Sequence, residues 1–190
     1  MKPQRQLVTY YYQEHFLELL HFVKSTYSHI LDDKQLRFIL DFQNLSRNEQ
    51  CLYVRMANRK GHIFHKHALL YQEIDDFALA QDGLSSKGVA RRLQECDYRF
   101  WLKCLKKINC CRKLAFPSSP IGAKTKIIQL IAEQVCFSDF CQQVSSTDYL
   151  VQGKLDSINF ILFLYFGKPQ VLHLRQHAQI LSETKILQPG

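Results

Sequence analysis

The sequence predicts a mainly α-helical fold that begins with a winged helix-turn-helix and has only a little β-structure, in the wing. Three observations lead to this fold class. Apolar residues near the start recur at helical spacing, a capping box opens a helix rich in basic residues, and short apolar stretches follow it. The chain has 190 residues, 46% of them hydrophobic. It can therefore bury the core of one ordinary domain or of two small ones.

The helices are predicted from apolar spacing and from capping residues. Apolar side chains within residues 16–31 fall on one helix face. Asp32 and Asp33 then supply an N-cap for a second helix. Ser46 and Glu49 have the spacing of a capping box, in which each side chain accepts a hydrogen bond from the other residue's backbone N–H. The box predicts a third helix, basic at its far end, which stops just before Gly61.

Two short apolar stretches, residues 62–64 and 69–71, follow the third helix. Three short helices and a small β-ribbon are typical of a winged helix-turn-helix, whose third helix meets duplex DNA while the ribbon touches the backbone beside it. A further helix is expected to end near Gly83. We therefore expect a winged-helix-like domain at residues 7–84.

The positive charge of the chain is unevenly distributed. The net charge is +8, and residues 87–113 hold nine basic residues against two acidic ones. Residues 47–66 add five basic residues against a single glutamate. Clustered positive charge is typical of proteins that bind polyanions. A solvated basic helix without a partner would carry the same charge, so the charge alone leaves both interpretations open.

Motifs for catalysis or metal binding are missing from the sequence. It has no phosphate-binding glycine loop, no Gly-x-Ser-x-Gly elbow and no carboxylate and lysine arrangement of a metal-dependent nuclease. The seven cysteines include no Cys-x-x-Cys pair and are expected to be reduced thiols, while His62, His65 and His67 lie among lysines that repel a cation. The acidic group at residues 73–76 is expected at a helix N-terminus. We predict no catalytic residue, no metal site and no cofactor in this chain.

Three sequence motifs mark the first part of the chain, and few families place Leu-Tyr-Val-Arg, Arg-Lys-Gly and Tyr-x-Glu-Ile in the order found in them. They are the run from Tyr10 to Phe16, the run Leu-Tyr-Val-Arg-Met-Ala-Asn-Arg-Lys-Gly at residues 52–61, and Tyr-x-Glu-Ile at residues 71–74. With these motifs, residues 10–77 resemble the start of the Fanconi-anaemia-associated nuclease family. The resemblance implies structure-specific DNA nucleases of the phosphodiesterase I type, which act on 5′ flaps and interstrand-crosslink damage.

The family also implies a domain order. Its members join a winged-helix and SAP-type DNA-binding region to a helical-repeat middle and a C-terminal VRR-NUC nuclease domain. By this resemblance, residues 85–152 would be a basic SAP-like helical region, and residues 153–190 an apolar closing segment with a truncated or drifted tail. The VRR-NUC domain, for which Mg²⁺ or Mn²⁺ would be the cofactor, has no counterpart here. Branched or flapped duplex DNA and a separately encoded nuclease half would be the partners.

We therefore expect the DNA-binding N-terminal portion of a structure-specific nuclease of 5′-flap and interstrand-crosslink repair. A stand-alone helix-turn-helix regulator and a basic protein-interaction module with an acidic partner are the alternatives. An enzyme complete in this chain is the least expected. The side chains expected to contact DNA phosphates are Arg55, Arg59, Lys60, Lys66, Lys103, Lys106, Lys107, Arg112, Lys113, Lys124 and Lys126.

The longest unbroken apolar run, residues 160–166, is far shorter than the roughly 20 residues of a membrane-spanning helix. The N-terminus does not resemble a secretory signal. We expect a protein that is neither secreted nor bound to a membrane, located in the cytoplasm or nucleoid of a bacterium or in the nucleus of a eukaryote. Periodicity does not decide whether residues 158–166 form a buried strand or a buried helix. We expect residues 160–166 to pack against elements outside this chain.

Overall fold

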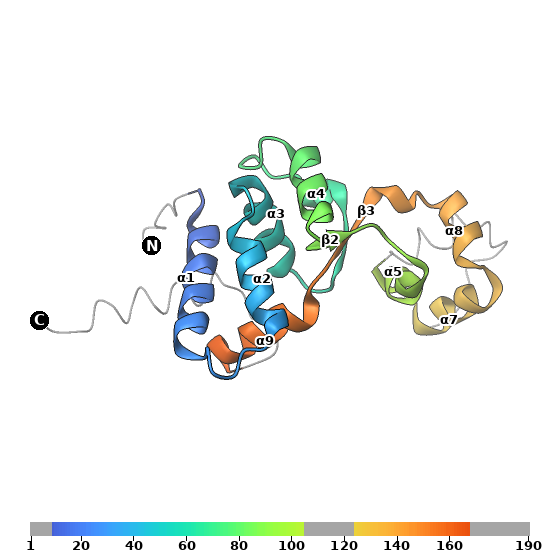
Figure 1. The fold of residues 1–190 in the computed structure, drawn as a ribbon. Helices are drawn as coiled ribbons and strands as arrows, with labels where there is room; N and C mark the ends of the chain where they lie inside the picture. Colours follow the sequence, from blue (N-terminus) through green and yellow to red (C-terminus); the bar gives the residue numbers. More distant parts are fainter. Residues whose placement is uncertain (1–8, 105–123, 168–190) are drawn as a thin grey trace, which may run out of the picture. The chain divides into compact units, whose positions relative to one another are not determined.

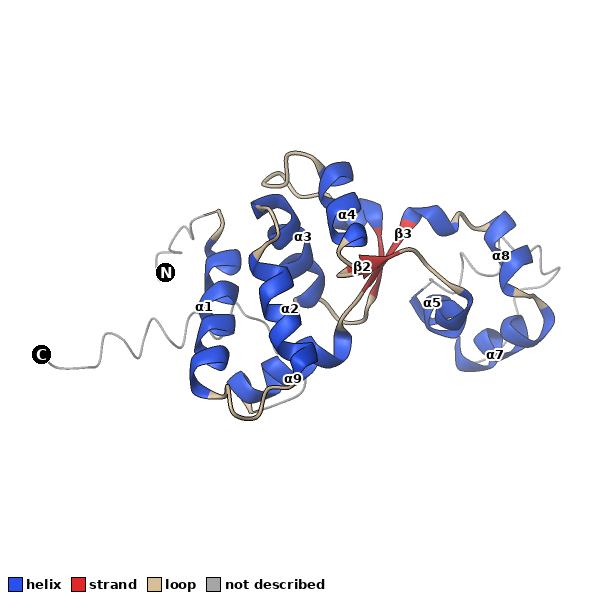
Figure 2. Cartoon of the chain, viewed as in Figure 1, coloured by secondary structure: helices blue, strands red, loops and turns tan. Residues whose placement is uncertain are grey.

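The computed structural model describes residues 9–104 and 124–167 (Figure 1). Helices make up most of this part, and strands form one small three-stranded antiparallel sheet (Figure 2). This architecture confirms the mainly α-helical fold class. Within the described ranges, no helix combines the length and the apolar character that crossing a membrane requires.

The chain divides into two compact units and passes from one to the other four times. The first unit takes in the residues up to 62, residues 70–90, and the residues from 152 onward. The second unit takes in residues 63–69 and 91–151. Each unit is therefore assembled from segments that are separated in the sequence.

The first unit is a cluster of helices around an aromatic core. Its described helices are α1 (Tyr11–Thr26), α2 (Asp33–Gln43), α3 (Arg47–Ala57), α4 (Phe77–Ser86) and α9 (Leu155–Phe166). The rings of Phe16, Phe38, Phe42 and Tyr53 are fully buried. Phe42 contacts Phe16 at 4.9 Å and Tyr53 at 5.8 Å between ring centroids, in edge-on geometry that favours aromatic pairs. These contacts join α1, α2 and α3.

Both predicted N-caps are confirmed, and of the two aspartates named for α2 it is Asp32 that caps the helix. The Asp32 carboxylate accepts hydrogen bonds from two backbone N–H groups at the start of α2. At the start of α3, the Ser46 N–H donates to the Glu49 carboxylate at 2.6 Å, and the Glu49 N–H donates to the Ser46 hydroxyl at 3.4 Å. The far end of α3 differs from the prediction, because the helix stops at Ala57. Gly61, with a φ of +91°, belongs to the turn that follows.

The second unit has its own core around a tryptophan. Its described helices are α5 (Tyr98–Cys104), α7 (Lys124–Gln134) and α8 (Phe137–Gln143), and short 3-10 turns lie at Lys66–Leu69, Glu95–Asp97 and Ser146–Asp148. Trp101 and Phe140 are fully buried, with ring centroids 4.9 Å apart and planes nearly perpendicular. Leu102, Ile131 and Val151 complete the same cluster. The second unit thus has a buried core of its own.

The sheet consists of β1 (Ile63–His65), β2 (Ala90–Arg91) and β3 (Tyr149–Gln152), in the order β1-β3-β2. β1 pairs antiparallel with β3, and Phe64 lies opposite Leu150. The first apolar stretch after α3 is therefore a strand, as predicted for a wing. The second, residues 69–71, forms no strand, so the prediction of a local ribbon is wrong there. The partner of β1 comes from a segment far away in the sequence.

The apolar run near the end of the described chain lies in helix α9. This helix begins after Lys154, which has a φ of 58°, and is capped at its end by Gly167, whose φ of 68° glycine adopts without steric cost. Ile161 and Leu162 are buried, and α9 packs against α1 and α2. The expectation that this run packs only against elements outside the chain is therefore wrong. The first unit itself covers the inner face of α9.

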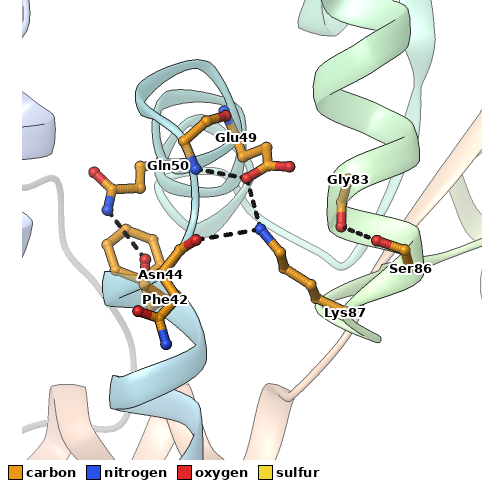
Figure 3. Close-up of polar contacts among 8 residues, drawn as sticks. Phe42, Asn44, Glu49, Gln50, Gly83, Ser86 and Lys87 are labelled. Atoms are coloured by element: carbon orange, nitrogen blue, oxygen red, sulfur yellow. Dashed lines mark hydrogen bonds and ion pairs between the residues drawn. The ribbon is translucent and has the colours of Figure 1, made fainter.

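A polar contact fastens α4 to the start of α3. The Lys87 ammonium, just after α4, donates to the Glu49 carboxylate at 3.0 Å and to the Asn44 carbonyl at 3.3 Å (Figure 3). Burial would raise the pKa of Glu49, but the bonds from the Ser46 N–H and from Lys87 outweigh it and lower the pKa. Gly83 of α4 lies so close that a Cβ there would be 1.6 Å from a carboxylate oxygen of Glu49. A side chain at this position would therefore force the Glu49 carboxylate to move.

Replacing Gly83 by alanine should cost stability only while Glu49 is present. Alanine is the better helix former by about 1 kcal/mol. Its Cβ, however, would displace the Glu49 carboxylate from Ser46 and Lys87, bonds that together contribute about 1–2 kcal/mol. We expect Gly83→Ala to destabilise the wild-type chain by up to about 1 kcal/mol and to stabilise the Glu49→Ala variant by about 1 kcal/mol. Urea unfolding of the four proteins measures this coupling, and additive effects would contradict the contact.

Candidate nucleic-acid interface

Helix α3 is a core helix along most of its length. Seven of its eleven residues are buried, among them Glu49 and Gln50. The Gln50 side chain donates to the Phe42 carbonyl and accepts from Gln13, so its polar atoms are satisfied inside the unit. This burial argues against the expected placement of the third helix along a groove of duplex DNA. Its two ends are the parts that remain accessible.

Arg55, in the last turn of α3, is paired inside the first unit. Its Nε donates to the Glu73 carboxylate at 2.9 Å, and its Nη2 bonds to the same oxygen. Its guanidinium lies 4.0 Å from the ring centre of Tyr12 and 4.3 Å from that of Tyr71. Arginine favours such stacked, multiply bonded sites. Most of the charge of Arg55 is therefore compensated by a neighbouring carboxylate.

Glu73 is the acceptor at the centre of this group. Its side chain is only 9% exposed, and it also accepts a hydrogen bond of 2.9 Å from the Tyr12 hydroxyl. Burial alone would raise the pKa of Glu73, but the bonds from Arg55 and Tyr12 outweigh it and hold the pKa below its usual 4.5. The pKa of the Tyr12 hydroxyl is raised by its own burial and by Cys51 beside it. Glu73 is therefore a carboxylate and Tyr12 a neutral donor at neutral pH.

Two basic residues after α3 lack a carboxylate partner. Arg59 and Lys60 are exposed, and within the described residues neither forms an ion pair. The Arg59 Nη2 donates to the Tyr71 hydroxyl at 2.5 Å, and its guanidinium lies 5.5 Å from the Tyr71 ring centre. Arg47, at the other end of α3, is also exposed and lies 5.0 Å from the ring centre of Tyr10. Both ends of α3 thus present a cation that a tyrosine orients.

The remaining predicted contacts belong to the second unit or lie outside the described residues. Lys66 opens the 3-10 turn after β1 and is half-buried, while Lys103 is exposed on α5 with its ammonium 5.3 Å from the Phe100 ring centre. Lys124 and Lys126 belong to α7. Four of the predicted residues lie outside the part that the structure describes: Lys106, Lys107, Arg112 and Lys113. Of the predicted set, the first unit brings together Arg55, Arg59 and Lys60.

The basic run at residues 87–113 carries less free charge than its composition indicates. Lys87 is paired with Glu49. Arg91 holds Asp97 with two bonds of 2.5 and 2.8 Å, and hydrogen bonding to Asp97 raises the pKa of this guanidinium. Lys87 and Arg91 therefore each pair with a nearly buried carboxylate and stabilise the fold.

Three residues important to this site were missed in the sequence: Tyr12, Tyr71 and Glu73. Their signals were present, since the sequence has a run of tyrosines at residues 10–12 and arginines four residues apart at 55 and 59. Neither signal shows that a distant glutamate would join them. In the part of the chain that the structure describes, no group of three histidine, cysteine, aspartate or glutamate side chains could hold a metal ion.

Residues 10–91 match the family model described as FAN1, HTH domain. These residues form a FAN1-type HTH domain. The match confirms the resemblance to the Fanconi-anaemia-associated nucleases and covers the site of Arg55, Arg59 and Glu73. The domain begins just before α1 and ends in β2.

Curated relatives share this HTH domain. The Fanconi-associated nuclease 1 homolog of Pseudomonas aeruginosa is 37% identical over 79 residues, which are 42% of this chain and 14% of that protein. The homolog of Oryza sativa subsp. japonica is 35% identical over 77 residues, which are 40% of this chain and 8% of that protein. The aligned part of the chain thus spans about a seventh or less of the length of these relatives.

Solved structures with a similar fold cover more than the HTH domain. A crystal structure of paFAN1 bound to 2-nt 5′-flap DNA with a gap is similar at a TM-score of 0.71 and 22% identity, over 87% of this chain and 31% of that chain. A second, with 1-nt 5′-flap DNA, has a TM-score of 0.69 at 22% identity, over 85% and 31%. At this identity the likeness establishes a common fold. Because it covers so much of the chain, that fold extends beyond the FAN1-type HTH domain into the second unit.

Glu73 should stabilise the fold at neutral pH and lose this effect in acid. Its folded-state pKa lies below the usual 4.5, so its contribution is complete above that value and disappears as the pH falls through the lower, folded-state pKa. The difference in free energy of unfolding between the wild type and Glu73→Gln should therefore be largest at neutral pH and shrink below pH 4.5. Urea unfolding across this pH range measures it. A difference that is independent of pH would contradict the ion pair, and Asp75→Asn, an exposed neighbour, is the control.

Proposed function

We propose that this chain is a DNA-binding part of a FAN1-type nuclease and that it binds branched or flapped duplex DNA through the phosphate backbone. The FAN1-type HTH domain and the fold shared with paFAN1, which was crystallised with 5′-flap DNA, support this proposal. The net charge of +8 agrees with a polyanionic partner. The observation that carries the proposal is the pair Arg59 and Lys60, exposed just after α3 without a carboxylate partner among the described residues.

The position of these cations favours recognition of the backbone over recognition of bases. Because α3 is buried on most sides, it presents its ends and not a face that could enter a groove. From Arg47 to Ala57, the two ends of α3, the helical rise of about 1.5 Å per residue gives a separation of about 15 Å, which is several phosphates of one strand. Such contacts fix the register and orientation of a protein on DNA but carry little sequence information.

The rest of the chain has a supporting role in this proposal. The second unit would be the SAP-like region and would extend the contact through Lys66, Lys103, Lys124 and Lys126. A VRR-NUC domain outside this chain, or on a separately encoded partner, would hold Mg²⁺ or Mn²⁺ and cleave the DNA. The protein would then be found with the DNA, in the nucleoid or the nucleus.

Binding should depend strongly on salt, and part of that dependence should come from Arg59 and Lys60. A protein that contacts six to ten phosphates loses roughly 10³–10⁵ in affinity between about 50 and 200 mM salt, and each lost contact lowers the slope of log K against log salt by about 0.9. We expect Arg59→Ala with Lys60→Ala to lower that slope by about 1.8. Lys34→Ala with Arg37→Ala, which removes two exposed cations of α2, is the matched control and should change the slope less.

Fluorescence anisotropy with 5′-flap, gapped and intact duplexes measures both the affinity and its dependence on salt. Tighter binding to the flap than to intact duplex of the same sequence supports the structure-specific part of the proposal. Strong preference for one sequence would favour a stand-alone regulator. Absence of binding to any of these DNAs at low salt would contradict the proposal and favour a protein-interaction module.

A further inference from the structure

Glu73 places a buried negative charge directly beside the cations that would meet phosphate. Its side chain is 9% exposed, against 30% for Arg55, and both residues belong to the first unit. A carboxylate near a polyanion-binding surface opposes binding through its charge. If this surface binds DNA, another contribution of Glu73 to binding must outweigh the repulsion between its carboxylate and the phosphates.

The bonds of Glu73 fix the orientation of Arg55. One oxygen of the carboxylate accepts from the Tyr12 hydroxyl, from Nε of Arg55 and from Nη2 of Arg55. Bonds to two nitrogens define the plane of a guanidinium and not only its position. That plane is in contact with the rings of both Tyr12 and Tyr71, at 4.0 and 4.3 Å from their centres. Arg55 is thus held as a spacer between two tyrosines.

Tyr71 connects the fixed Arg55 to Arg59. The Tyr71 ring rests on the guanidinium of Arg55, and its hydroxyl accepts the hydrogen bond of 2.5 Å from Arg59. An exposed arginine that is already oriented loses less conformational freedom when it binds a phosphate. The contacts therefore run from Glu73 through Arg55 and Tyr71 to Arg59, all within one unit.

We propose that Glu73 is a positioning residue for nucleic-acid binding: it orients Arg59 through Arg55 and Tyr71, and this effect outweighs the repulsion between its charge and the phosphates. The inference rests on the proposed function and deepens it. It makes a prediction of opposite sign to that of simple electrostatics. If only charge mattered, neutralising Glu73 would tighten binding.

Asp75 provides a matched control two residues along the same segment. It is exposed and makes no hydrogen bond or ion pair in the described part of the chain. Glu73→Gln and Asp75→Asn each raise the net charge by one and leave an uncharged isostere. Only Glu73→Gln removes a charge that holds Arg55. Asp76 is unsuitable as a control, since its carboxylate caps α4.

The experiment is an anisotropy titration of the whole chain with a gapped 5′-flap duplex at several salt concentrations. We expect Asp75→Asn to bind as tightly as the wild type or slightly more tightly. We expect Glu73→Gln to bind roughly 2- to 10-fold more weakly, the range for ordering one long side chain on binding. In an Arg59→Ala background, Glu73→Gln should cause no further weakening, because the residue through which it acts is gone.

Tyr71→Phe tests the same route without touching Glu73. It removes the hydroxyl that accepts from Arg59 and keeps the ring against Arg55. It should weaken binding like Glu73→Gln and should likewise have no effect beside Arg59→Ala. If urea unfolding shows that Glu73→Gln is not fully folded under the titration conditions, Tyr71→Phe alone tests whether Arg59 is oriented through Tyr71.

Each outcome bears on the inference. Tighter binding by Glu73→Gln, equal to that of Asp75→Asn, would overturn positioning while leaving DNA binding intact. Equal weakening with and without Arg59 would show that Glu73 acts on the fold as a whole, and would also overturn it. If the wild type binds none of the DNAs, the proposed function fails and the positioning role fails with it.

Discussion

Burial of α3 is the constraint on which the first unit depends. Its apolar residues join the aromatic core formed by α1 and α2, and burying so much of a helix places polar groups inside as well. A buried carboxylate is costly unless it is paired and hydrogen-bonded. The unit meets this requirement at both ends of α3. Lys87 pairs with Glu49 at the start, and Arg55 pairs with Glu73 at the end. Each pair also fastens a later segment of the chain to the helix.

Because of these pairs, the net charge overstates the positive charge that is available to a polyanion. The chain has 25 basic and 17 acidic residues, and a simple count treats every cation as available to a partner. Arg55, Lys87 and Arg91 instead hold carboxylates that are 6–11% exposed. Removing one of these cations would leave a nearly buried carboxylate without its partner, so these cations are committed to the fold. Among the described residues, Arg59 and Lys60, both predicted from the sequence as phosphate contacts, remain without a carboxylate partner.

Local patterns in the sequence predicted the parts of the fold that local physics determines. The N-cap at the start of α2 and the capping box at Ser46 were predicted correctly because a cap involves only neighbouring residues. The strand pairing of Phe64 with Leu150 was not predicted, since no local pattern specifies a partner so far along the chain. The uncharged run in α9 was ambiguous for the same reason, because its secondary structure is decided by packing against α1 and α2. The bonds between Arg55 and Glu73 were not predicted either, because only the fold determines where the segment of Glu73 lies.

The same constraint links stability to recognition. A helix that is committed to the core cannot offer a long face to a groove, but its ends must emerge, and capped ends are well fixed. Cations at such ends can meet a backbone at defined spacing without reading bases, which suits recognition of DNA shape. An anion such as Glu73 is useful in this arrangement because a rigid guanidinium needs a fixed acceptor. The buried carboxylate that the fold requires beside α3 can thus also determine the geometry of the exposed arginine next to it.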